Sequence, residues 1–107
     1  MAGFNGFGGN MQNLMKQAQM MQEKMKEKEA LMEDWEIVGT SGGEAVVVYM
    51  NAKKIINGIE LDESVVDPED VEMLEDLIMA AINDGYKKAD EVYKEQMAEF
   101  GGMGGMI

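Results

Sequence analysis

The sequence predicts a single α+β domain with the element order α-β-β-β-α, in which two long helices flank a small antiparallel three-stranded sheet. Stretches near both ends carry apolar residues at alternating spacings of three and four, as helices do. The segment between them, residues 35–62, instead holds short apolar or alternating runs typical of strands. At 107 residues the chain has the length of one domain, which we place at 1–107 with glycine-rich, mobile tails at 1–9 and 101–107.

Residues 10–33 predict the first helix, because they contain no glycine, no proline and no β-branched residue. Along this stretch a narrow seam has the spacing of a coiled coil; it comprises Met11, Leu14, Ala18, Met21, Met25, Lys28 and Met32. We expect the seam to face a partner helix. Met15 and Met20 fall off the seam and are better candidates for surface contacts.

Three strands are predicted within the segments WEIVGT, AVVVYM and KKIINGIELD, with turns at 41–43 and 51–54. The second strand is apolar on both faces, so both faces of the sheet need cover. One helix layer covers one face, and the other face points to a second subunit. We therefore expect a homodimer whose interface includes Val46, Val47, Val48, Leu77, Ile78, Ala81 and Ile82.

The second helix is predicted to begin at DPED, where Asp67 is the expected N-cap and Pro68 the first helical residue, and to end near Phe100. Helices of about 24 and 32 residues would be about 36 and 48 Å long, more than the diameter of a small domain. They must therefore project beyond the sheet as an arm. Antiparallel packing of the two helices is expected to bring Lys16 near Lys94.

The net charge of −12 is unevenly distributed. Residues 1–33 contain four lysines and four acids, whereas residues 63–84 contain eight acids and no lysine. The acidity therefore belongs to one part of the molecule and does not exclude nucleic acid from another. Because the chain has no cysteine and no histidine, we expect no metal, no cofactor and no catalytic activity. Since no apolar run is long enough to span a bilayer, we expect a cytoplasmic protein with no membrane partner.

Four blocks of the sequence resemble the YbaB/EbfC family of nucleoid-associated proteins. They are NLMKQAQMMQEKM at 13–25, SGG followed by AVVV at 41–48, DPEDVEMLEDL at 67–77 and AAINDGYKKA at 80–89, all in the family's order. The resemblance covers about residues 10–98. It implies a tweezer-like homodimer, joined through its sheets and helix bases, whose helical arms bind double-stranded DNA in the nucleoid.

Candidate DNA contacts are lysines of the two helices, namely Lys16, Lys24, Lys26, Lys87, Lys88 and Lys94. The family more often carries arginine in the pair that matches Lys87 and Lys88, and alanine where Gly85 stands. Lysine makes point-charge contacts with phosphates but is poorly suited to bidentate recognition of bases, so little sequence specificity is expected. An alternative interpretation is a clamp whose methionine-rich helices bind a protein partner, as a chaperone or adaptor would.

Overall fold

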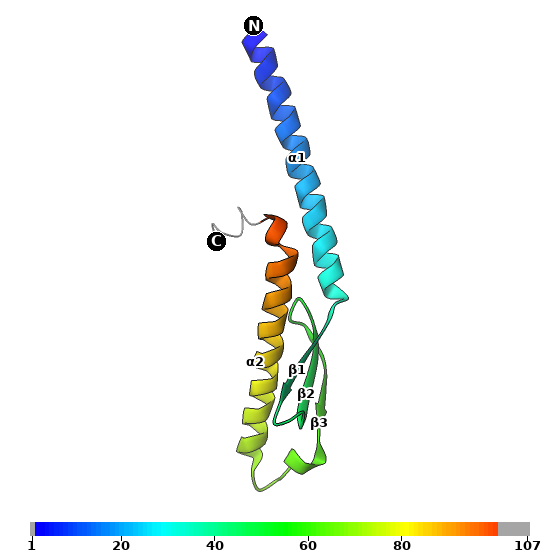
Figure 1. Ribbon diagram of the computed structural model, residues 1–107, viewed down its shortest axis with the longest axis vertical. Coiled ribbons are helices and arrows are strands. Elements are labelled where there is room, and N and C mark those ends of the chain that lie inside the picture. The colour runs from blue at the N-terminus through cyan, green and yellow to red at the C-terminus, as the bar shows by residue number, and fades with distance from the viewer. Residues whose placement is uncertain (1, 101–107) are drawn as a thin grey trace.

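A computed structural model of the chain describes residues 2–100, and it confirms the predicted α-β-β-β-α fold (Figure 1). The elements in chain order are α1 (Ala2–Glu33), β1 (Glu36–Ser41), β2 (Val46–Asn51), β3 (Ile56–Leu61), the 3₁₀ turn η1 (Glu63–Val65), α2 (Val71–Gln96) and the 3₁₀ turn η2 (Ala98–Phe100). The described part of the chain thus has one open sheet and two long helices.

The sheet is antiparallel with the order β1-β2-β3, as predicted. In register, Val48 of β2 lies between Gly39 of β1 and Ile59 of β3. The first hairpin turns at Gly42 and Gly43, whose φ angles of 60° and 67° are in the left-handed region that glycine adopts without steric cost. These two residues therefore fix the connection that the sequence predicted between the first two strands.

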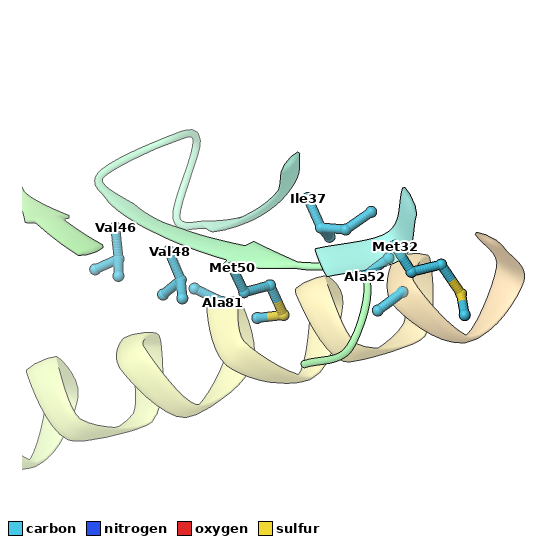
Figure 2. Packing of buried hydrophobic residues seen from close by; sticks show 8 residues of the cluster. Met32, Ile37, Val46, Val48, Met50, Ala52 and Ala81 are labelled. Carbon is cyan, nitrogen blue, oxygen red and sulfur yellow. The ribbon is translucent and has the colours of Figure 1, made fainter. Parts of the chain in front are cut away.

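The core lies between the sheet and α2, which runs over β1 and β2 (Figures 1 and 2). From β2, alternate residues point toward α2, because successive side chains of a strand face opposite sides of the sheet. The buried side chains shared by the sheet, α2 and the end of α1 are Met32, Ile37, Val46, Val48, Met50, Ala52, Ala81 and Ala89. One face of the sheet is therefore covered within a single subunit.

Only the carboxyl-terminal end of α1 is anchored in this core. Met32 is buried, and its carbonyl oxygen accepts hydrogen bonds from the backbone N–H of Ala52 (3.1 Å) and of Trp35 (3.3 Å). From this anchor α1 extends well past the end of α2, and the molecule measures 81 × 23 × 17 Å (Figure 1). The overhang predicted from helix length is therefore present, and α1 provides nearly all of it.

The helix boundaries differ from those predicted. α2 begins at Val71, because Asp70 is its N-cap and accepts a hydrogen bond from the backbone N–H of Met73 at 3.2 Å. The prediction that Asp67 caps α2 is wrong: its carboxylate accepts from the backbone N–H of Glu69 at 2.9 Å, within a turn that precedes the helix. At the other end, α2 stops at Gln96, before the predicted Phe100.

The two glycine-rich ends were predicted to be mobile tails. The structure continues α1 back to Ala2, eight residues before the predicted start at Asn10. Mobility of residues 1–9 stays a prediction. The other predicted tail, residues 101–107, lies outside the described residues, as does residue 1.

Contact between α2 and β1 is so close that it leaves no room for a side chain at Gly39, which lies opposite Gly85. A Cβ placed on Gly39 would collide with the carbonyl oxygen of Ala81 and would lie 2.6 Å from the backbone nitrogen of Gly85. A Cβ placed on Gly85 would instead meet the flexible end of the Met50 side chain. The backbones of strand and helix therefore touch at this point, without side chains between them.

Asp84 joins α2 to the outer edge of β1. Its carboxylate accepts a hydrogen bond from the backbone N–H of Thr40 (3.0 Å) and pairs with Lys88 (3.1 Å), whose Nζ also donates to the carbonyl oxygen of Val38 (3.0 Å). The Thr40 N–H, followed by Lys88, lowers the pKa of Asp84 below its ordinary value. Asp84 and Lys88 thus satisfy one backbone N–H and one carbonyl oxygen that an edge strand would otherwise expose.

Replacing Asp84 by alanine should lower the free energy of unfolding by about 1–2 kcal/mol, the usual worth of hydrogen bonds to a charged group. Because the folded-state pKa is lowered, the unfolded chain binds this proton more readily. The stabilisation is therefore present above the ordinary aspartate pKa of about 4 and is lost as the pH falls through the folded value. Urea titrations followed by Trp35 fluorescence measure the free energy of unfolding at each pH. Below about pH 4 the wild type should lose more of this free energy than Asp84→Ala does, and equal losses in the two proteins would contradict the prediction.

Candidate nucleic-acid interface

The nine lysines of the chain fall into two groups in the structure. Four of them form ion pairs: Lys28 with Glu99 (3.0 Å), Lys53 with Glu33 (3.1 Å), Lys54 with Asp90 (2.6 Å) and Lys88 with Asp84 (3.1 Å). The other five are exposed and have no carboxylate partner within residues 2–100; they are Lys16, Lys24, Lys26, Lys87 and Lys94. Five of the six candidate DNA contacts are thus available to an external anion.

Three of these five lysines lie on α1. Lys16 and Lys26 lie on the exposed surface of the helix, and Lys24 borders a shallow groove that also includes Met21 and Phe100. At about 100° per residue the three lysines point in different directions, with Lys24 and Lys26 roughly 80° to either side of Lys16 around the helix axis. They therefore surround the outer side of the arm rather than forming a single row.

The two helices overlap less than predicted. Lys28 of α1 lies beside the end of α2, where its Nζ donates to Gln96 Oε1 at 3.4 Å. Lys94, two residues earlier in α2, is therefore close to this level, whereas Lys16 lies twelve residues, or about 18 Å, further out along α1. The expectation that Lys16 approaches Lys94 is wrong, because α2 ends early and turns into η2 (Figure 1).

On α2 the two adjacent candidates have different surroundings. Lys88 is held against β1 by the Val38 carbonyl oxygen and by Asp84, so it is part of the contact between helix and sheet. Lys87 lies two residues after the buried Gly85, on the side of α2 away from the sheet, and is exposed. Both are level with the sheet and not on the projecting arm.

Acidic residues collect at the opposite end of the molecule from α1. Residues 67–76, between β3 and the first turns of α2, carry six carboxylates, and α1 begins at the far end of the long axis (Figure 1). Since charges separated by more than about 10 Å are largely screened at physiological salt, these acids repel little from the lysines of the arm. The separation of charge along the sequence is thus also a separation in space.

The predicted dimer-interface residues differ in burial. Val46, Val48 and Ala81 are completely buried within one subunit, so the cover that they need is already provided by α2 and the sheet. The remaining predicted residues are half-buried; they are Val47, Leu77, Ile78 and Ile82. Direct contacts with a second subunit stay a prediction for all seven.

Sequence reasoning missed an uncovered apolar surface on β3. Ile56, Ile59 and Leu61 are exposed, because α2 covers β1 and β2 but does not extend over the third strand. Their spacing in KKIINGIELD predicts a strand, and the same apolar residues are the signal that could have identified a face in need of cover. The open edge of the sheet is therefore also its apolar edge.

No group of three or more acidic side chains in residues 2–100 is arranged to hold a metal ion. Neither of the long helices in this part of the chain is apolar enough over a sufficient length to cross a bilayer.

Comparison with known proteins agrees with this geometry. The chain is 47% identical over 104 residues to a nucleoid-associated protein of Alkaliphilus metalliredigens. The aligned residues cover 94% of this chain and 91% of the relative. It is 50% identical over 101 residues to a nucleoid-associated protein of Agathobacter rectalis, and this alignment covers 94% of this chain and 89% of the relative.

A similar fold is found in the crystal structure of an uncharacterized protein from Helicobacter pylori, with a TM-score of 0.73 and 28% identity over 81% of this chain and 91% of that one. The sequence model of the YbaB/EbfC DNA-binding family matches residues 7–106, nearly the whole chain. The resemblance seen in the four sequence blocks is therefore confirmed. The chain belongs to the YbaB/EbfC DNA-binding family, whose curated members include nucleoid-associated proteins.

Proposed function

We propose that this protein binds double-stranded DNA in the cytoplasmic nucleoid as a homodimer, and that lysines of its helices contact the phosphates. The observation that supports this most is the set of five exposed lysines without carboxylate partners, three of which lie on the projecting α1. Lysines already paired with carboxylates would have to exchange one anion for another, whereas these five can bind phosphate directly. Such binding would organise the nucleoid and affect gene expression.

Little sequence specificity is expected from this arrangement. The chain has no arginine, and its free lysines are spread around α1 instead of being aligned for one groove. A lysine ammonium attracts phosphate as a point charge, so its contact is similar for every DNA sequence. Affinity should therefore depend on salt far more than on the identity of the bases.

Gel retardation with two unrelated duplexes of equal length tests the proposal. Affinity should be similar for both duplexes and should fall by about tenfold or more between about 50 and 200 mM salt, because bound lysines release counterions from DNA. A complex that is insensitive to salt, or that forms with only one of the duplexes, would contradict phosphate binding by lysine.

The homodimer is supported by the surface that one subunit leaves open. Ile59 and Leu61 expose apolar side chains beside α2. Val47 and Tyr49 occupy the opposite face of the sheet, over which no helix of residues 2–100 lies. On the other edge of the sheet, the side chains of α2 already bond the backbone of β1. A second subunit is therefore expected to pack on the β3 side.

Replacing Ile59 by aspartate should convert the dimer into a folded monomer. The side chain is exposed in one subunit, so the charge does no harm to the core, but it would be buried without a partner in the dimer. Asn57→Asp adds the same charge to an exposed, polar position of β3 and should leave the dimer intact. Light scattering measures both, and a wild-type chain that is already monomeric would remove the dimer from the proposal.

A protein-binding clamp is the second candidate function. Met15 and Met20 support it, because they are 62% and 59% exposed on α1 and methionine is common on surfaces that accept varied partners. This function predicts that Met15→Ala with Met20→Ala abolishes capture of a protein partner while DNA binding stays at the wild-type level. Loss of DNA binding in this variant would instead place both methionines at the DNA surface.

A further inference from the structure

The apolar seam of α1 is largely exposed in the part of the chain that the structure describes. We define the α1 seam as Met11, Leu14, Ala18 and Met21, which were predicted to face a partner helix. Leu14 is 63% exposed and Met11 49% exposed. Within residues 2–100, η2 lies beside α1 at a groove bordered by Gln17, Met21 and Phe100. The partner helix that the spacing predicts is therefore not α2 of the same subunit (Figure 1).

The stability of α1 also calls for a partner. Its free portion contains four glycines at positions 3, 6, 8 and 9, and each costs a helix about 1 kcal/mol relative to alanine. A helical segment with several glycines and few tertiary contacts is weakly stable in water, because most helical stability in proteins comes from packing of an apolar face. Cover of the α1 seam would supply that packing.

We propose that the α1 seam pairs with the α1 seam of a second copy of this chain, so that molecules join arm to arm. This contact is separate from the packing on the β3 side proposed above. The seam has the narrow, three-and-four spacing that matches one helix, which another α1 provides, and it does not have the broader face that a sheet would need.

Charge is the observation that favours a second copy over an unrelated partner. Two chains of net charge −12 repel each other, yet residues 10–22 contain a single charged side chain, Lys16. The residues that border the seam, among them Asn10, Gln17 and Gln22, are neutral, so two seams can meet without opposing like charges. The seam is therefore a helical surface on which two copies can approach without strong repulsion.

The pairing is compatible with the lysine contacts proposed for DNA. Lys16 lies roughly 160° from Ala18 around the helix, and Lys26 lies roughly 80° from it. Helices joined along the seam would therefore keep Lys16 on their outer surface. Two joined molecules could then hold two DNA segments, although the pairing itself needs no DNA.

Sedimentation of the full chain without DNA, over a wide range of concentration, tests the pairing. The wild type should change from a dimer to a tetramer or a larger oligomer as its concentration rises. The variant Leu14→Glu with Met21→Glu should remain at two chains, because it places charges in the α1 seam. Gln12→Glu with Gln19→Glu is the matched control: it adds two glutamates with the same separation on an outer side of α1 and should behave as the wild type.

Three outcomes would overturn the inference. A wild type that stays at two chains at every concentration has no arm-to-arm contact. Equal behaviour of the seam variant and its control would show that added charge, and not the seam, matters. A seam variant that becomes monomeric would make the seam the dimer interface itself and not a separate contact.

A cross-link provides a second measurement, because the natural chain has no cysteine. Ala18→Cys places one thiol in the α1 seam, and Gln19→Cys places one on the outer side of the next position. Mild oxidation should join two chains through Cys at position 18 much faster than through position 19. Equal rates would contradict the pairing. Neither measurement includes DNA. Failure of the pairing would therefore leave the proposed DNA binding standing, and absence of DNA binding would leave the pairing standing.

Discussion

Reversing two lysines of the projecting helix, Lys16→Glu with Lys26→Glu, should lower the affinity for DNA by about a hundredfold or more at low salt. Each reversal removes a counterion-releasing contact and adds a carboxylate that repels the same phosphates, and the effect is doubled in a homodimer. The structure supports this because neither lysine has a carboxylate partner within residues 2–100. Gel retardation at about 50 mM salt measures the loss.

The matched control is Lys53→Glu with Lys54→Glu, which changes the net charge by the same amount at the turn between β2 and β3. These lysines already pair with Glu33 and Asp90, and exposed pairs of this kind contribute only about 0–1 kcal/mol, so the fold should persist. Affinity should fall by less than about tenfold, through long-range repulsion alone. Equal losses in the two variants would mean that net charge, not the arm, governs binding.

Replacing Gly39 by alanine should destabilise the fold by about 3 kcal/mol, near the upper end of what overpacking usually costs. The new methyl group would collide with the Ala81 carbonyl oxygen and lie 2.6 Å from the Gly85 nitrogen, both of which belong to the backbone of α2. Neither atom can move unless the helix moves. Urea unfolding at a fixed chain concentration measures the change, since the stability of a dimer depends on concentration.

Gly85→Ala is the informative comparison, because it lies on the other side of the same contact. There the new methyl group meets the end of Met50, a flexible side chain that can adopt another rotamer. Alanine also gains about 1 kcal/mol over glycine within a helix, which offsets the displacement of Met50. The net change should be within about 1 kcal/mol, and a loss equal to that of Gly39→Ala would contradict this description of the contact.

Local patterns predicted most of the fold. The apolar strand AVVVYM and the glycine turn at 42–43 are set by residue type, and both are confirmed. The start of α2 was wrong because DPED contains two possible caps, and the choice of Asp70 over Asp67 depends on a turn that no periodicity reveals. Boundaries of this kind are decided by single hydrogen bonds, which a sequence pattern does not show.

The lysines show a similar limit. The family resemblance and the lysine residue type made Lys88 a candidate DNA contact equal to Lys87. Only the folded chain brings Lys88 to the Val38 carbonyl oxygen, fifty residues away in sequence. The exposed β3 surface was missed for the same reason, since it depends on which strands α2 covers. Contacts between distant segments therefore limited the prediction of the site more than that of the fold.

The most direct test of phosphate binding by the arm is to measure the reactivity of all nine lysines with and without DNA. Limited reductive methylation keeps the charge of lysine, and mass spectrometry of peptides reports each position. We expect a DNA duplex of arbitrary sequence to slow the methylation of Lys16, Lys24 and Lys26 strongly, and that of Lys87 and Lys94 to a smaller extent. Methylation of Lys53 and Lys54 should stay unchanged. Protection of Lys53 and Lys54 with free reaction at Lys16 and Lys26 would contradict the proposed mode of binding.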